Sequence, residues 1–139
     1  MELDSEIYNS IKLLSARGEH LVDRDRYLEA VTAFKTAIDL LPEPKEQWSA
    51  WTWLAAAIGD AYYLDDRFAE ARSWFRAAVA GPDGLGNPFI HLRLGQTARR
   101  LGDEKRAVDE LLRAYMGDGV DVFEDDVEDL AFLRAHVKL

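Results

Sequence analysis

Apolar residues recur along most of the chain with the three- to four-residue spacing of helices that bury one face. Near the start, Ile7, Ile11, Leu14 and Leu21 fall on one side of such a helix, which would run to about residue 22. No segment alternates apolar and polar residues long enough to indicate a strand. The pattern therefore predicts an all-α protein.

Start and stop signals group the expected helices into pairs. Two prolines near residue 42 end the second helix, and the loop GPDGLGN separates the fourth helix from the fifth. Asn87 followed by Pro88 is a strong start signal for the fifth. We therefore predict one domain over residues 1–139, with helix pairs at about 5–41, 45–81 and 88–117 and a single helix at about 124–137.

The three pairs share one spacing of small and large residues. Counted from Gly18, Gly59 and Gly95, an alanine follows at 12 and at 19 residues, and a large apolar residue at 16. These positions hold Ala30, Phe34 and Ala37, then Ala71, Phe75 and Ala78, then Ala107, Leu111 and Ala114. A glycine lets two helices cross closely, and a large residue from the second helix then fills the space. Because one such pair cannot bury its apolar face alone, we expect the pairs to stack and the last one to need a cap.

This spacing resembles the tetratricopeptide repeat family. The middle copy carries most of the family pattern, in Ile58-Gly59, Tyr62, Ala71, Phe75, Ala78 and Pro82. The outer copies depart from it at Arg17 and Ala98, and the third lacks a closing proline. The resemblance covers about residues 8–117. It implies three antiparallel helix hairpins stacked as a short right-handed superhelix, in which the first helix of each hairpin lines a concave groove.

Register from the three glycines gives the expected groove positions. Glu19 and Asp60 would make one end of the groove acidic, and Arg93 and Arg99 would make the other end basic. The partner-binding residues that we predict are Lys12, Glu19, Trp53, Asp60, Tyr63, Arg93, Gln96 and Arg99. The alternative is that Trp53 and Phe89 belong to the core between repeats and that the charges are ordinary surface.

The family's clamp for chaperone C-terminal carboxylates is absent. It needs lysine, asparagine and arginine side chains at set places, which here hold residues such as Ser15, Glu19, Trp53 and Ala57. Helical geometry places Trp53 far round the helix from Trp51, so the clustered tryptophans cannot all enter one core. At least one should be exposed or lie in an interface, where tryptophan is a frequent hot-spot residue.

Charge is concentrated near the C-terminus. The chain of 139 residues has a net charge of −9, and its acids include Asp118, Asp121, Glu124, Asp125, Asp126, Glu128 and Asp129 with no base among them. These acids are either a solvated helix start, favoured by the helix dipole, or a patch that attracts a basic partner. An acidic chain without a basic stripe is not expected to bind nucleic acid.

Little in the sequence indicates catalysis. The three histidines, His20, His91 and His136, lie far apart without a neighbouring nucleophile, so we expect ordinary surface or rim positions. The chain has no cysteine and no calcium-binding or phosphate-binding loop. We therefore predict no catalytic residues, no metal site and no cofactor. The acidic start is no secretory signal, and no apolar run is long enough for a membrane span, so we expect a cytoplasmic protein away from membranes.

Two functional hypotheses remain. The first is a non-enzymatic module that binds another protein or a peptide in its concave groove, in an adaptor or assembly role. The second is a dedicated inhibitor, such as an immunity protein that neutralises a basic toxin enzyme through its acidic surface. Salt dependence separates the two, because the acidic surface would rely more on electrostatic steering. Self-association is open under either hypothesis.

Overall fold

The computed structural model describes residues 2–139, which form seven α-helices and two short 3-10 helices without a strand. This confirms the predicted all-α fold of three hairpins and a capping helix. The hairpins are α1 (Ser5–Asp23) with α2 (Tyr27–Asp39), α3 (Ser49–Leu64) with α4 (Phe68–Ala80), and α5 (Pro88–Arg100) with α6 (Glu104–Asp118). The 3-10 helices are η1 (Lys45–Gln47) and η2 (Gly119–Phe123), and α7 (Val127–His136) is the last element.

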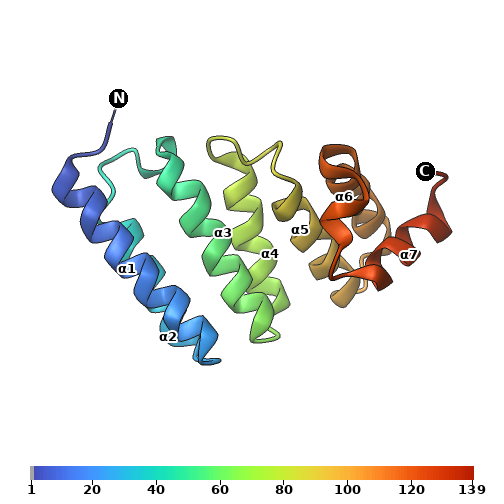
Figure 1. Ribbon diagram of the computed structural model, residues 1–139, viewed down its shortest axis with the longest axis horizontal. Coiled ribbons are helices and arrows are strands. Elements are labelled where there is room, and N and C mark those ends of the chain that lie inside the picture. The colour runs from blue at the N-terminus through green and yellow to red at the C-terminus, as the bar shows by residue number, and fades with distance from the viewer. Residues whose placement is uncertain (1) are drawn as a thin grey trace.

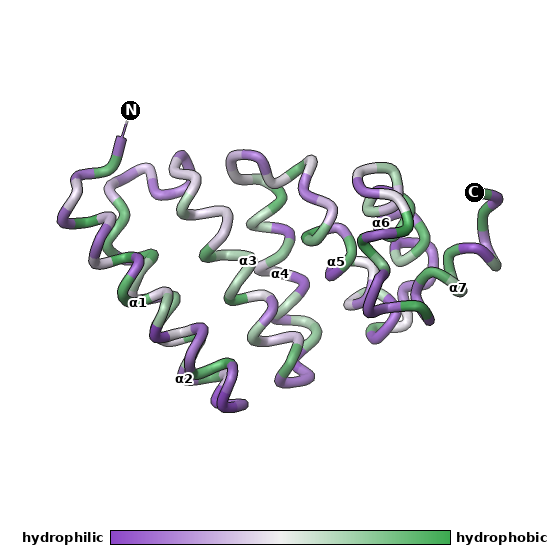
Figure 2. Tube along the Cα trace, viewed as in Figure 1, coloured by the Kyte–Doolittle hydropathy of each residue, from purple (hydrophilic) through white to green (hydrophobic). Residues whose placement is uncertain are grey.

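The helices lie side by side in chain order, so that the two chain ends are at opposite ends of an elongated row (Figure 1). Neighbouring hairpins join where α2 packs on α3 and where α4 packs on α5. The first helices of the second and third hairpins, α3 and α5, also touch directly. Apolar and polar positions alternate along the helices (Figure 2), as expected when each helix buries only part of its surface.

Each hairpin closes on a contact between a glycine and a large side chain. The pairs are Gly18 with Phe34, Gly59 with Phe75, and Gly95 with Leu111. A Cβ atom added to these glycines would lie 2.4, 2.9 and 2.5 Å from the nearest side-chain atom of the partner. The three large residues are at most 1% exposed. The repeated spacing in the sequence therefore arises because a side chain larger than hydrogen does not fit at the three helix crossings.

The start of the third helix differs from the expected position. We predicted a helix from Lys45, but residues 45–47 form a 3-10 turn and α3 begins only at Ser49. Trp48 interrupts the helix with an extended backbone, at φ −90° and ψ 141°. Its indole is buried, and Nε1 donates a hydrogen bond to the carbonyl oxygen of Pro42 at 2.8 Å. Anchoring of this side chain across the loop therefore outweighs continuation of the helix. Trp53, further along α3, is the exposed tryptophan that the spacing required.

The capping helix covers the apolar end of the third hairpin, as predicted. Leu133 of α7 is fully buried in one cluster with Leu111, Ala114 and Phe123. A polar contact holds the far end of α7, where His136 Nε2 lies 2.5 Å from Glu104 Oε1. No helix among residues 2–139 is both long and apolar enough to cross a membrane.

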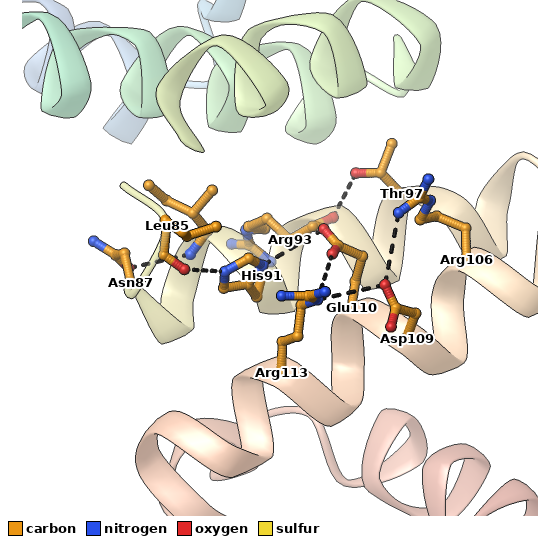
Figure 3. A network of polar contacts seen from close by, with 10 residues as sticks. Leu85, Asn87, His91, Arg93, Thr97, Arg106, Asp109, Glu110 and Arg113 are labelled. Carbon is orange, nitrogen blue, oxygen red and sulfur yellow. Dashed lines mark hydrogen bonds and ion pairs between the residues drawn. The ribbon is translucent and has the colours of Figure 1, made fainter. Parts of the chain in front are cut away.

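The expectation of surface histidines is wrong for His91. Its side chain is only 4% exposed, and it lies between α5 and α6 against Glu110, which is 6% exposed (Figure 3). Nε2 is 2.6 Å from the carbonyl oxygen of Leu85 and therefore carries the proton that it donates. Nδ1 lies 3.5 Å from Glu110 Oε2 but makes no hydrogen bond. The Glu110 carboxylate and the Leu85 carbonyl favour the imidazolium and raise the pKa of His91 above its usual value, against the opposing effect of burial.

Substitution of Gly59 by leucine tests the close crossing of α3 and α4. Gly59→Leu should lower the free energy of unfolding by about 1–3 kcal/mol or more, because Phe75 cannot make room within a packed core. The control is Gly86→Leu, since a Cβ atom at Gly86 meets nothing within 4 Å. Urea unfolding of both variants gives the comparison. Equal stability of the two variants would contradict the crossing.

The buried His91–Glu110 contact predicts a pH dependence of stability. Because folding raises the pKa of His91, its contribution is complete below the unfolded pKa of about 6.5 and is lost as the pH rises through the folded pKa. His136 acts in the same direction, so the measurement uses a His136→Gln background. We expect the urea unfolding free energy to fall between about pH 6 and pH 8, and Glu110→Gln to flatten that fall. An unchanged slope in Glu110→Gln would show that the pair does not titrate in this range.

Candidate functional site

An apolar hollow on the predicted groove side lies between α3, α5 and the loop after α4. Its volume is about 440 Å³, and its walls include Trp53, Ala56, Asp60, Phe89 and Ile90. The aromatic rings of Trp53 and Phe89 are 39% and 42% exposed. The alternative that these two residues are core between repeats is therefore wrong. Two half-exposed rings on the walls of one cleft are suited to grip an apolar side chain.

Trp53 also borders a second hollow. This one has a volume of about 660 Å³ and lies between the start of α1, with its preceding segment, and the start of α3. Tyr8 and Trp48 are among its other lining residues. Beyond it on α1, Lys12 sits over the Tyr8 ring, with Nζ 5.4 Å from the ring centroid. The two hollows share the Trp53 side chain, which makes it the central residue of the groove.

The Arg93 side chain is fixed at the edge of the aromatic cleft. Its Nε donates to Asp60 Oδ1 at 2.6 Å, and its NH1 donates to Gln96 Oε1 at 2.8 Å. The guanidinium carbon lies 4.8 Å from the Tyr63 ring centroid and 5.2 Å from that of Phe89. Burial raises the pKa of the Tyr63 phenol above its usual value, against the lowering effect of Arg93 and Arg100. Hydrogen bonds and ring contacts together leave Arg93 little freedom.

The polar contacts continue from α5 to the capping helix. Gln96 Nε2 donates to Asp129 Oδ2 at 2.9 Å, and Arg99 NH1 donates to Asp129 Oδ1 at 2.7 Å. The Arg99 guanidinium also covers the Phe132 ring at 4.3 Å. Gln96 is 3% exposed and uses both ends of its amide within the chain. One acid of the C-terminal tail is thus part of the groove's structure.

This network changes the expected charge pattern of the groove. Asp60 and Arg93 neutralise each other, so the division into an acidic and a basic end is wrong at the centre. Asp60 Oδ2 is left without a hydrogen-bond donor from residues 2–139, and the side chain is 27% exposed. Glu19 is exposed on α1 and takes no part in the network. The groups left accessible on the predicted groove side are the aromatic rings, one carboxylate oxygen of Asp60, and Lys12 and Glu19 on α1.

Sequence register placed the predicted residues on the right helices but did not show their mutual contacts. Asp129 lies in the first turn of α7, as the helix-start interpretation of the acidic tail expects, but it also pairs with Arg99 thirty residues earlier. No spacing rule joins two such distant positions, because the contact depends on how α7 folds back. Within residues 2–139 no group of three histidine, cysteine or acidic side chains is arranged to hold a metal ion. The arrangement as a whole is suited to binding.

Comparisons with known proteins agree with this geometry. A family model described as "Tetratricopeptide repeat" matches residues 15–84, from within α1 to the loop after α4. Among solved structures, the chain is similar to the first TPR of Spaghetti (RPAP3) bound to the HSP90 peptide SRMEEVD. The identity is 20% and the TM-score 0.69, over 96% of this chain and 94% of that chain. At this identity the likeness shows the fold, including the third hairpin that the family model does not reach. No curated protein sequence matches the chain.

A double-mutant cycle tests the fixed Asp60–Arg93 pair. The side chains of this pair are 27% and 19% exposed, so we expect a coupling energy of about 1–2 kcal/mol from Asp60→Ala and Arg93→Ala. The matched control is the Arg26–Glu29 pair, at 2.8 Å but with side chains 52% and 55% exposed. Its coupling should stay below about 0.5 kcal/mol. Equal coupling energies from urea unfolding would mean that the Asp60–Arg93 pair stabilises the protein no more than an exposed surface pair.

Proposed function

The chain belongs to the tetratricopeptide repeat family, and from that premise we propose that it is a non-enzymatic protein-binding module. Its ligand is a segment of another protein, held in the concave groove in an adaptor or assembly role. The observation that carries this proposal is the cleft of about 440 Å³ whose walls include the half-exposed rings of Trp53 and Phe89. Exposed aromatics beside a hollow are typical of binding hot spots.

The cleft supports a ligand with an apolar anchor. Ala56 and Ile90 leave its interior apolar, and its volume is close to that of a site for a large side chain with its neighbouring backbone. At one edge, Asp60 Oδ2 has no donor within the described chain. A backbone N–H or a basic side chain next to the anchor would complete that hydrogen bond. The proposed ligand is therefore a segment with a large apolar residue flanked by a donor.

The same reasoning argues against a carboxylate-terminated ligand. The solved relative is bound to SRMEEVD, which is an acidic peptide. In this chain the basic groups Arg93 and Arg99 are engaged by Asp60 and Asp129, and Glu19 adds a further negative charge on α1. The free C-terminus of an acidic peptide would meet no unengaged pair of basic groups there. We expect SRMEEVD to bind this chain no better than a scrambled peptide.

A second candidate function is supported by the acidic edge at the C-terminal end. Asp118, Asp121, Glu124, Asp125 and Glu128 are exposed, and no basic group within residues 2–139 pairs with them. An inhibitor of a basic enzyme would use such an edge for electrostatic steering. Neutralising three of these acids would then remove binding, whereas a groove ligand would lose only part of its on-rate.

The test is a selection of binding peptides from a random library, followed by affinity measurements on groove variants. We expect selected peptides to carry an apolar anchor and to lose about 30-fold or more in affinity to Trp53→Ala and to Phe89→Ala, the typical loss at a hot spot. Asp60→Ala should cost about tenfold, as expected for a desolvated hydrogen-bond acceptor. Isothermal titration gives the affinities.

The control is Met116→Ala, which removes a side chain that is 77% exposed on α6 and does not line the groove. Its affinity should equal that of the wild type. Unchanged unfolding temperatures would show that the groove variants fold normally. If Glu124→Gln, Asp125→Asn and Glu128→Gln together abolish binding while Trp53→Ala has no effect, the acidic-edge function replaces the groove function.

A further inference from the structure

A third hollow lies between α4, α5 and α6, away from the groove helices α1 and α3. It is a cleft of about 240 Å³ with a strongly basic lining. Arginines reach it from both sides, two from α4 and two from α6. Its principal lining residues are Arg72, Arg76, His91, Arg106, Glu110 and Arg113. In a chain with nine more acidic than basic side chains, such a concentration of arginine is unusual.

The two sides of the cleft differ in how their charges are balanced. On α6, Arg106 and Arg113 lie 3.6 and 3.4 Å from the same carboxylate oxygen of Asp109 (Figure 3). On α4, Arg72 and Arg76 have no carboxylate within 4 Å among residues 2–139. These two are four residues apart and share one face of the helix, where like charges repel. An anion between them would relieve that repulsion.

The floor of the cleft does not repel an anion. Glu110 is the acid at the floor, and it faces Nδ1 of His91 at 3.5 Å. Both side chains are more than nine-tenths buried, and Nδ1 has no hydrogen-bond partner. On its other side, Glu110 Oε1 lies 3.8 Å from Arg113 Nε, so the Glu110 charge is faced by basic groups of the chain on two sides. Arg72 and Arg76, which have no carboxylate within 4 Å among residues 2–139, are then free to act on a ligand.

We propose that this cleft is a binding site for a single oxyanion, a carboxylate or a phosphate, held by Arg72 and Arg76 of α4 with Arg113 on the opposite wall. Guanidinium groups match the geometry of such oxyanions. The small volume admits one anionic group and not a polymer. The positive field of the arginines is screened beyond a Debye length of about 8–10 Å at ordinary salt. The remainder of a long acidic ligand would therefore be repelled by the net charge of −9.

Inorganic phosphate is the first probe, titrated at constant ionic strength against chloride. The readout is the Nε–H resonances of the arginine side chains by NMR. We expect saturable chemical-shift changes at Arg72 and Arg76. The affinity for phosphate should fall about tenfold or more in Arg72→Gln/Arg76→Gln, because charge-assisted hydrogen bonds are removed. The matched control is Arg24→Gln/Arg134→Gln, which removes two exposed arginines with no carboxylate partner in the described chain.

A second arm distinguishes a free anion from one carried by a partner protein. A short capped peptide with one phosphoserine, and its glutamate counterpart, are titrated in the same way. Tighter binding of either peptide than of free phosphate identifies a partner's side chain as the source, whereas equal affinity identifies a free anion. The proposed site would be overturned if no probe gave saturable shifts. It would also be overturned if the Arg72→Gln/Arg76→Gln variant bound phosphate with the same affinity as the wild type.

Discussion

The structure depends on three places where a helix carries no side chain. At Gly18, Gly59 and Gly95 the missing Cβ atom leaves room for Phe34, Phe75 and Leu111, and the two helices of each hairpin can cross closely. Every later feature requires that approach. Within each hairpin it buries the large side chain, and neighbouring hairpins then stack where α2 packs on α3 and α4 packs on α5. The row of hairpins in turn places Trp53 and Phe89 on the two sides of one cleft.

Polar contacts then hold the groove in one shape. Asp60 on α3, Arg93 and Gln96 on α5, and Asp129 on α7 form a continuous set of hydrogen bonds. The capping helix therefore closes the apolar core and also orders the groove side chains. For the proposed ligand this surface is already organised, so less conformational entropy would be lost on binding. This also explains why the basic groups predicted for ligand binding are mostly engaged within the chain.

The fold was predictable because its signals are local or periodic. Gly59, Phe75 and the helix start at Asn87 each follow from spacing or from neighbouring residues. Helix angles also predicted that at least one of the clustered tryptophans is exposed, and in the structure that residue is Trp53. What spacing could not show were contacts between distant segments. The pairing of Arg99 with Asp129, and the burial of His91 against Glu110, depend on how separate helices meet. The interruption of the helix at Trp48 depends in the same way on a contact with Pro42 across a loop.

The central claim is that an apolar side chain of a partner enters the cleft between α3 and α5. An isotope-filtered nuclear Overhauser experiment on a labelled, library-selected peptide bound to the unlabelled chain tests it most directly. The account predicts cross-peaks from the peptide's anchor side chain to the rings of both Trp53 and Phe89. Cross-peaks confined to exposed residues beside the acidic edge, such as Val120 and Val127, with none to either ring, would contradict it.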